Sequence, residues 1–195
     1  MTQRNRMSTN LLRQAYAQGY FPMPHPHSGE LMWLCPEPRA IIPLSGFHVS
    51  RSLQRTLRSG HLRATFDVDF AGVMQGCSER HDTWITDEFK AAYLQLHKDG
   101  NAHSVEIWQD QKLVGGVYGV SLNGAFFAES KFHRVTDASK VALFYLIERL
   151  NSCGIELLEV QFLTEHLATL GAVEISRSDY MMRLRSALHS SARFH

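Results

Sequence analysis

Three strand-like runs follow one another between residues 103 and 130, and they constrain the fold more than any other feature of the chain. The runs span residues 103–108, 113–120 and 125–130. A polar turn at 109–112 joins the first two, and Asn123-Gly124, a dipeptide typical of tight hairpins, joins the last two. The pattern therefore predicts an antiparallel meander of three strands.

Helical periodicity occurs on both sides of this meander, and one further strand-like run follows it at residues 156–162. Helices are expected at residues 8–19, 87–99, 137–150, 165–170 and 178–188. Two more are expected, one that begins at residue 50 and one that ends near residue 76. Hairpins followed by a long helix, a strand and another helix predict an α+β fold with a mixed sheet.

Length and composition are those of an ordinary soluble protein. The chain has 195 residues, of which 44% are hydrophobic and 20% charged, which supports one medium domain, or one domain with a small appendage. No run approaches the ~18 apolar residues of a membrane span, and the first ten residues lack a signal-peptide core, so we expect a cytoplasmic protein. Because the formal net charge is only +1, any contact with nucleic acid must come from local patches.

Cysteine and histidine usage argues against two further classes of protein. The three cysteines are odd in number and far apart, so a disulfide framework is not expected. His25 and His27 are the nearest thing to a histidine cluster, and they have no Cys, Asp or Glu at ligand spacing. A solvated turn is therefore a better interpretation than a metal site. Both histidines lie in residues 20–38, a segment that holds five of the six prolines and is expected to be an irregular loop.

Three features of the predicted sheet are candidates for chemistry. The run 113–120 contains three glycines, which fits a bulge or a closely approaching ligand, but equally fits tight packing against a helix. Glu129 and Ser130 end the next run, either at an exposed rim or pointing into a cleft. Glu159 and Gln161 lie two apart on a strand, so their side chains are expected on one face. A carboxylate beside an amide can accept or relay a proton, or it can belong to a structural hydrogen-bond network.

Two features are compatible with RNA binding. Arg51, Arg55 and Arg58 share one helix face, which fits contact with a phosphate backbone or simply an exposed arginine stripe. Trp84 lies in a polar loop, where an aromatic ring either stacks on a base or seals the core.

Short sequence runs along nearly the whole chain carry a family resemblance. They are GYFPM (19–23), PEPRAIIPL (36–44), FHVSRSL (47–53), GC (76–77), TWIT (83–86), AHSVEIW (102–108), LVGGVYGV (113–120), AFFAES (125–130), DASKVAL (137–143), QF (161–162) and LGAVEI (170–175). None is decisive alone, but as a collinear set they resemble the bacterial leucyl/phenylalanyl-tRNA–protein transferases. The resemblance implies a small N-terminal α/β domain at residues 1–63 and a larger domain at 64–195 with an N-acetyltransferase-like (GNAT-like) mixed sheet.

The resemblance also implies an activity. Members move leucine or phenylalanine from charged tRNA to the N-terminal amine of proteins beginning with Arg or Lys, which marks those proteins for degradation through the N-degron pathway. Aminoacyl-tRNA is the co-substrate, no metal or diffusible cofactor takes part, and a monomer is implied. A pocket without polar demands discriminates weakly between apolar side chains, since one methylene is worth only ~1–3 kcal/mol. One pocket is therefore compatible with transfer of leucine, of phenylalanine and of methionine.

Site residues follow from the positions that match the family. The implied catalytic set is Glu159, Gln161 and Glu129. The implied aminoacyl pocket contains Val117, Phe126, Ser130, Lys131, Leu143 and Leu146. Trp84 and Met23 are implied to lie near the terminal adenosine of the tRNA, and Arg51, Arg55 and Arg58 are the candidates for its backbone.

The chain departs from the family pattern at several of these positions. Ala128 replaces a glycine and Lys131 replaces a methionine at the pocket, so we expect a donor pocket that is narrower or more polar. Glu159 replaces an aspartate, and a shift of ~1 Å in a catalytic group can be costly. Ser176 replaces a proline at the start of the last helix.

Two other functions remain open at the level of sequence. A CoA-dependent N-acetyltransferase of the same fold would need a glycine-containing loop for the pyrophosphate, whereas residues 132–140 contain no glycine. A non-catalytic descendant that binds tRNA or peptide is compatible with the changes at 128, 131 and 159. The donor amino acid, the acceptor residue and the oligomeric state are not determined by the sequence.

Overall fold

The computed structural model describes residues 7–25, 28, 30–79 and 85–195. The strands are β1 (Phe21–Pro24), β2 (Leu31–Leu34), β3 (Arg39–Ile41), β4 (Arg63–Phe66), β5 (Ala102–Gln109), β6 (Lys112–Leu122), β7 (Ala125–His133), β8 (Leu157–Gln161) and β9 (Val173–Ile175). The helices are α1 (Thr9–Ala17), α2 (Arg51–Ser59), α3 (Phe70–Ser78), α4 (Asp87–Lys98), α5 (Ala138–Ser152), α6 (Glu165–Ala168) and α7 (Arg177–His189).

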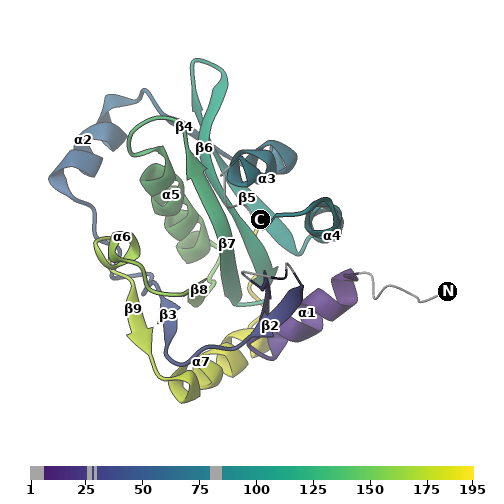
Figure 1. Cartoon of the computed structure of the whole chain (residues 1–195). Helices are drawn as coiled ribbons and strands as arrows, with labels where there is room; N and C mark the ends of the chain where they lie inside the picture. The colour runs from purple at the N-terminus through teal and green to yellow at the C-terminus, as the bar shows by residue number, and fades with distance from the viewer. Residues whose placement is uncertain (1–6, 26–27, 29, 80–84) are drawn as a thin grey trace.

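A seven-stranded mixed sheet organises the described part of the chain, with strand order β4-β5-β6-β7-β8-β3-β9. Strands β5, β6 and β7 form the predicted antiparallel meander. After the crossover through α5, strand β8 pairs in parallel with β7. The predicted α+β class with a mixed sheet is therefore confirmed. A separate hairpin, β1-β2, lies beside α1 (Figure 1).

Helices cover both faces of the sheet and bury two apolar clusters. Figure 1 shows α2, α5 and α6 on one side and α3 and α4 on the other. Side chains that alternate along a strand point to opposite faces, and β7 shows this directly, because Phe127 belongs to the cluster under α3 and α4, whereas Phe126 belongs to the cluster under α5. Both phenylalanine side chains are buried.

Side-chain caps explain where most of the helices begin. The N-cap residues whose side chains accept a hydrogen bond from a first-turn backbone N–H are Ser8, Ser50, Asp69, Thr86, Thr164 and Ser176. Such a cap satisfies a donor that the helix leaves unpaired. Helix α5 differs, because its N-cap Asp137 has a φ of 64° and makes no side-chain cap bond.

Four short strands, β1, β2, β3 and β9, were not predicted from the sequence. The proline-rich segment 20–38, expected as an irregular loop, contains the strands β1 and β2. The three-residue strands β3 and β9 lie beyond β8 and pair with each other. Strands this short carry little periodicity, and their partners are distant in sequence. Strand β3 belongs to the main sheet although it precedes residue 64. The division of the chain into two domains at residues 63 and 64 remains a prediction.

Candidate functional site

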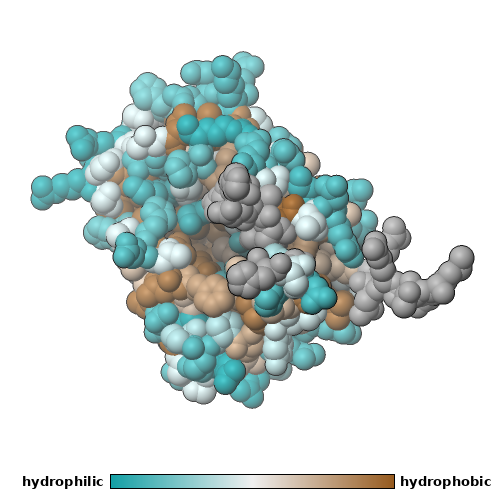
Figure 2. All heavy atoms as spheres, in the orientation of Figure 1, coloured by the Kyte–Doolittle hydropathy of each residue, from teal (hydrophilic) through white to brown (hydrophobic). Residues whose placement is uncertain are grey.

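A cavity of about 310 Å³ opens where two parallel strands stop pairing. The registered pairs of β7 and β8 end at Phe127 with Glu159. The residues that line the cavity are Met23, Val117, Ala128, Glu129, Ser130, Lys131, Leu143, Val160, Gln161, Phe162, Thr164 and Leu167. On the face shown in Figure 2, hydrophobic side chains gather around the middle of the molecule and hydrophilic ones toward its rim. An apolar cavity with a few polar groups is the usual form of a small-molecule site.

A bulge in β7 presents Glu129 to this cavity. In the pairing of β6 with β7, Tyr118 is opposite Ser130 and Gly119 is opposite Ala128, so Glu129 is the extra residue. A bulge bends a strand and re-aims a side chain. A Cβ at Gly119 would collide with the carbonyl oxygen of Phe127, so this position requires glycine.

Two tyrosine hydroxyls surround the carboxyl group of Glu129. The Oη atom of Tyr16 lies 2.6 Å from Oε1, and the Oη atom of Tyr93 lies 3.1 Å from Oε2. The two hydroxyls are themselves 2.5 Å apart. These three contacts share only two tyrosine hydrogens, so all three are satisfied at once when Glu129 carries a proton.

Burial raises the pKa of Glu129 to about 8, although the hydrogen bond from Tyr16 lowers it. The charge of Glu159 raises this pKa further, and the hydrogen bonds from Tyr93 and Gln161 lower it. Glu129 is therefore a carboxyl group that exchanges a proton near neutral pH, where an ordinary glutamate is fully ionised.

Gln161 connects Glu129 to a second buried carboxylate. Its Nε2 atom donates to Oε1 of Glu129 at 3.2 Å, and its backbone N–H donates to Oε1 of Glu159 at 2.5 Å. The φ of Gln161 is 66°, a left-handed conformation that is uncommon for a residue with a side chain. The side chains of Glu159 and Gln161 were expected on one face of the strand because an extended backbone was assumed. With the left-handed backbone at Gln161, its side chain reaches the cavity, whereas that of Glu159 lies behind it.

Glu159 forms a fully buried ion pair with Arg39. The Nε atom of Arg39 lies 2.7 Å from Oε1 of Glu159, and both side chains are 0% exposed. The guanidinium also donates to the carbonyl oxygen of Gly19 at 2.9 Å and lies between the rings of Phe21 and Tyr180. Burial lowers the pKa of Arg39, but the Glu159 carboxylate more than offsets this, so the net pKa is raised. Burial raises the pKa of Glu159, whereas the positive charge of Arg39, which does not lose its proton in proteins, lowers it.

The cavity brings together many, but not all, of the residues expected from the sequence. Those that line it are Met23, Val117, Glu129, Ser130, Lys131, Leu143 and Gln161. Phe126 and Leu146 are buried in the cluster that also contains Val117 and Leu143. Arg51, Arg55 and Arg58 are exposed on α2. Trp84 lies outside the described residues.

Sequence reasoning did not assign a role to three residues that support the site. Tyr16 and Tyr93 lie in two of the predicted helices, and Arg39 lies in the run PEPRAIIPL. A tyrosine on an apolar helix face gives no sign of what its hydroxyl meets. These roles depend on segments that are far apart in the chain.

The glycines of β6 serve packing at two positions. A Cβ at Gly115 would meet Ala138 of α5, and one at Gly116 would meet Val73 of α3. Tight sheet-to-helix packing thus accounts for both. The alternative of a bulge holds at Gly119, where the register of the sheet shifts.

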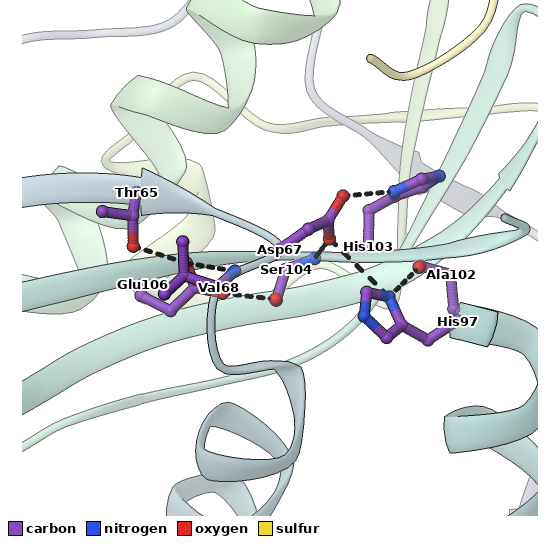
Figure 3. Close-up of polar contacts among 8 residues, drawn as sticks. All are labelled: Thr65, Asp67, Val68, His97, Ala102, His103, Ser104 and Glu106. Atoms are coloured by element: carbon purple, nitrogen blue, oxygen red, sulfur yellow. Dashed lines mark hydrogen bonds and ion pairs between the residues drawn. The ribbon is translucent and has the colours of Figure 1, made fainter.

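A second polar cluster lies at the other end of the sheet (Figure 3). The carboxylate of Asp67 contacts Nδ1 of His103 at 2.7 Å and accepts from the backbone N–H of Ser104 at 2.9 Å. Glu106 accepts from Thr65 at 2.6 Å, and burial raises its pKa. These groups satisfy one another around the connection from β4 to α3, so we interpret the cluster as structural.

Within the described residues, no group of three or more His, Cys, Asp or Glu side chains is arranged to hold a metal ion. Across the same ranges, no helix has the length and apolar character needed to cross a membrane. Within the described part of the chain, no disulfide joins Cys35, Cys77 and Cys153.

Comparisons with known proteins agree with the resemblance seen in the sequence. A family model described as leucyl/phenylalanyl-tRNA protein transferase matches residues 41–185, and one for the N-terminal domain of that protein matches residues 5–37. A leucyl/phenylalanyl-tRNA–protein transferase from Ruegeria pomeroyi is 51% identical, covering 94% of this chain and 88% of that protein. One from Herpetosiphon aurantiacus is 54% identical, covering 97% of this chain and 98% of that protein.

Solved structures with some likeness include L-PGS from Bacillus licheniformis and a GCN5-related N-acetyltransferase from Kribbella flavida. The first is 13% identical with a TM-score of 0.44, covering 82% of this chain and 55% of that one. The second is 13% identical with a TM-score of 0.43, covering 72% of this chain and 55% of that one.

Proposed function

Because this chain belongs to the leucyl/phenylalanyl-tRNA–protein transferase family, we propose that the cavity between β7 and β8 is where an aminoacyl group leaves its tRNA. The protein is an aminoacyltransferase that takes leucine or phenylalanine from charged tRNA. The family match favours a tRNA donor over acetyl-CoA. The acceptors are proteins that begin with Arg or Lys, and transfer marks them for N-degron degradation. A cytoplasmic monomer that uses no cofactor belongs to the same proposal.

The reaction requires proton transfer but little other covalent help. The acceptor amine attacks the ester carbonyl carbon, a C–N bond forms, and the C–O bond to the ribose oxygen breaks. The acceptor enters as an ammonium group, so its nitrogen loses two protons in total. One must go to a base before attack, and the other ends on the ribose oxygen. Because the ester is already activated, positioning and proton acceptance are the main tasks of the enzyme.

Glu129 is the proposed proton acceptor, and one observation carries this assignment. Among the described residues that line the cavity, Glu129 is the carboxylate. Burial raises its pKa to about 8, which matches the ~7.7–8.0 of a free α-amino group. A base matched to its substrate near the working pH transfers protons efficiently.

Gln161 and Glu159 have different parts in this proposal. Gln161 lines the cavity and contacts Glu129, so it orients the carboxyl group and can reach the amine. Glu159 acts through Gln161, because it holds the backbone N–H of that residue and is itself fixed by Arg39. The extra methylene relative to aspartate is accommodated within the ion pair.

A transfer assay tests the proposal. Leucyl-, phenylalanyl- and methionyl-tRNA are each offered with peptides that begin with Arg, Lys or a neutral residue. We expect product with the Arg and Lys peptides, and a decrease in kcat of roughly 100-fold or more for Glu129→Gln, as general-base catalysis contributes on that scale. Full activity in Glu129→Gln would exclude the assigned role.

The same assay tests the altered donor pocket. Ala128 and Lys131 both line the cavity, so Lys131→Met is expected to change the ratio of leucine, phenylalanine and methionine transferred. One methylene-sized change in a pocket is worth about 1–3 kcal/mol, or roughly 10- to 200-fold in selectivity. Identical ratios in the protein and the variant would contradict the idea that Lys131 shapes this pocket.

A further inference from the structure

A second cavity, of about 450 Å³, lies next to the first and has a different chemistry. It is lined by His133, Arg134, Val135, Thr136, Asp137, Ser139, Lys140 and His166. Basic and hydroxyl groups dominate this lining, whereas the first cavity is largely apolar. Nothing in the proposed transfer step uses these residues.

The two cavities share the elements that border them. Strand β7 contributes Lys131 to the first and His133 to the second. Two residues along an extended strand cover about 7 Å. Helix α6 likewise contributes Leu167 to the first cavity and His166 to the second. A ligand that fills the first cavity can therefore extend into the second without crossing the sheet.

The charges around the second cavity suit an anion. The carboxylate of Asp137 is occupied, because Lys140 bonds one of its oxygens at 2.9 Å and Thr56 bonds the other at 3.1 Å. Burial lowers the pKa of His166, and Lys131, Lys140 and His133 lower it further, which shows that basic groups converge there. Imidazole and hydroxyl groups, such as those of His133 and Ser139, can donate hydrogen bonds to an anion.

Helix α2 connects this cavity to an exposed basic surface. The bond between Thr56 and Asp137 joins α2 to the start of α5. The same helix carries Arg51, Arg55 and Arg58, all of them exposed. Figure 1 shows α2, α5 and α6 on one side of the sheet. Helix α2 thus packs against the start of α5 through Thr56 and carries exposed arginines on another face.

We propose that the cavity lined by His133, Lys140 and His166 binds phosphate groups of the 3′-terminal strand of the tRNA. This rests on the proposed function, which places the aminoacyl ester in the first cavity. Phosphate contacts carry no sequence information but fix register and orientation. They would hold the terminal nucleotide so that its ester meets Glu129. The site then favours a long RNA donor over a minimal one.

Two donors distinguish this proposal from a failure of the proposed function. Leucyl-tRNA carries the phosphates, whereas 3′-O-leucyl-adenosine has the same ester without any phosphate. For Lys140→Ala and His166→Gln, we expect the ratio of kcat/KM with leucyl-tRNA to kcat/KM with leucyl-adenosine to fall roughly tenfold. For Lys140→Ala, the salt dependence of kcat/KM with tRNA should also weaken by about one unit of log–log slope. Lys140→Arg keeps the cation and should retain most of the ratio.

Lys98→Ala is the matched control, because Lys98 is exposed on α4, on the opposite side of the sheet. Its donor ratio and salt slope should equal those of the unmodified protein. An unchanged ratio in both Lys140→Ala and His166→Gln would overturn the phosphate site, as would equal losses with both donors. If the unmodified protein transferred leucine from neither donor, the proposed function itself would fail.

Discussion

At the scale of single residues, the protonation of Glu129 depends on side chains that lie far from it in the chain. Tyr16 comes from the first helix and Tyr93 from α4, and both hydroxyls reach the same carboxyl group. Burial raises the pKa of Glu129, while these hydrogen bonds lower it. The two tyrosines therefore lower the pH at which Glu129, the proposed base, loses its proton.

This balance predicts the pH dependence of transfer. Tyr16→Phe and Tyr93→Phe each remove a hydrogen bond that favours the charged form, so the pKa of Glu129 should rise above its value of about 8. Less carboxylate is then present at pH 7, and kcat/KM should fall roughly three- to tenfold there. The difference should shrink as pH rises and the carboxylate forms in both proteins.

The measurement is kcat/KM for transfer between pH 6 and 9 (a range of roughly three units around the pKa). Tyr145→Phe, a half-buried tyrosine on α5 that does not line the cavity, serves as the control. A loss of activity that is the same at every pH would mean that the tyrosines support the fold and do not tune Glu129.

At the scale of elements, the Arg39–Glu159 pair joins β3 to β8 and the first hairpin. The guanidinium contacts the carbonyl oxygen of Gly19, the ring of Phe21 and the ring of Tyr180 of α7. Because Oε2 of Glu159 has no hydrogen-bond partner among the described residues, the carboxylate relies on Arg39 for compensation. An unpaired buried charge is far more costly than an exposed one.

Arg39→Met is therefore expected to lower the free energy of unfolding by about 3–5 kcal/mol. The double variant Arg39→Met with Glu159→Gln should recover part of this loss, because it contains no unpaired buried carboxylate. Urea denaturation followed by circular dichroism measures both. Arg134→Met is the exposed counterpart, because Arg134 and Glu79 are 43% and 47% exposed, and its cost should stay within about 1 kcal/mol. Equal costs for the two arginine variants would refute the structural role of Arg39.

At the scale of the whole molecule, the segment before residue 64 is integrated with the rest of the chain. Strand β3 lies in the main sheet between β8 and β9, Tyr16 contacts Glu129, and Arg39 is buried against Glu159. The expected division at residues 63 and 64 separates these partners. We therefore expect the two segments to unfold together.

A single cooperative transition is the corresponding prediction. Thermal unfolding should show a calorimetric enthalpy equal to the van't Hoff enthalpy, and tryptophan fluorescence and far-ultraviolet circular dichroism should give coincident curves. Two resolved transitions, or curves that differ between probes, would instead support independent folding of residues 1–63.

The sequence by itself determined the elements with strong local patterns. The meander, the parallel strand after α5 and the capped helices were predictable, because hairpin dipeptides, alternation and cap residues act over a few positions. The resemblance to a family also identified Glu129 and Gln161, which the structure brings together in one cavity. Strands β3 and β9 were not predictable, since three residues carry too little periodicity and their partners are distant.

The surroundings of Glu129, Glu159 and Gln161 became known only from the tertiary structure. The bulge that turns Glu129 toward the cavity, the tyrosine hydroxyls that contact it and the arginine behind Glu159 all come from separate segments. The left-handed backbone conformation of Gln161 likewise directs its side chain to the cavity, whereas Glu159 lies behind the cavity. The physical reason is that a pKa and an ion pair depend on burial and on neighbours in space. A residue type at a sequence position specifies neither until the chain has folded.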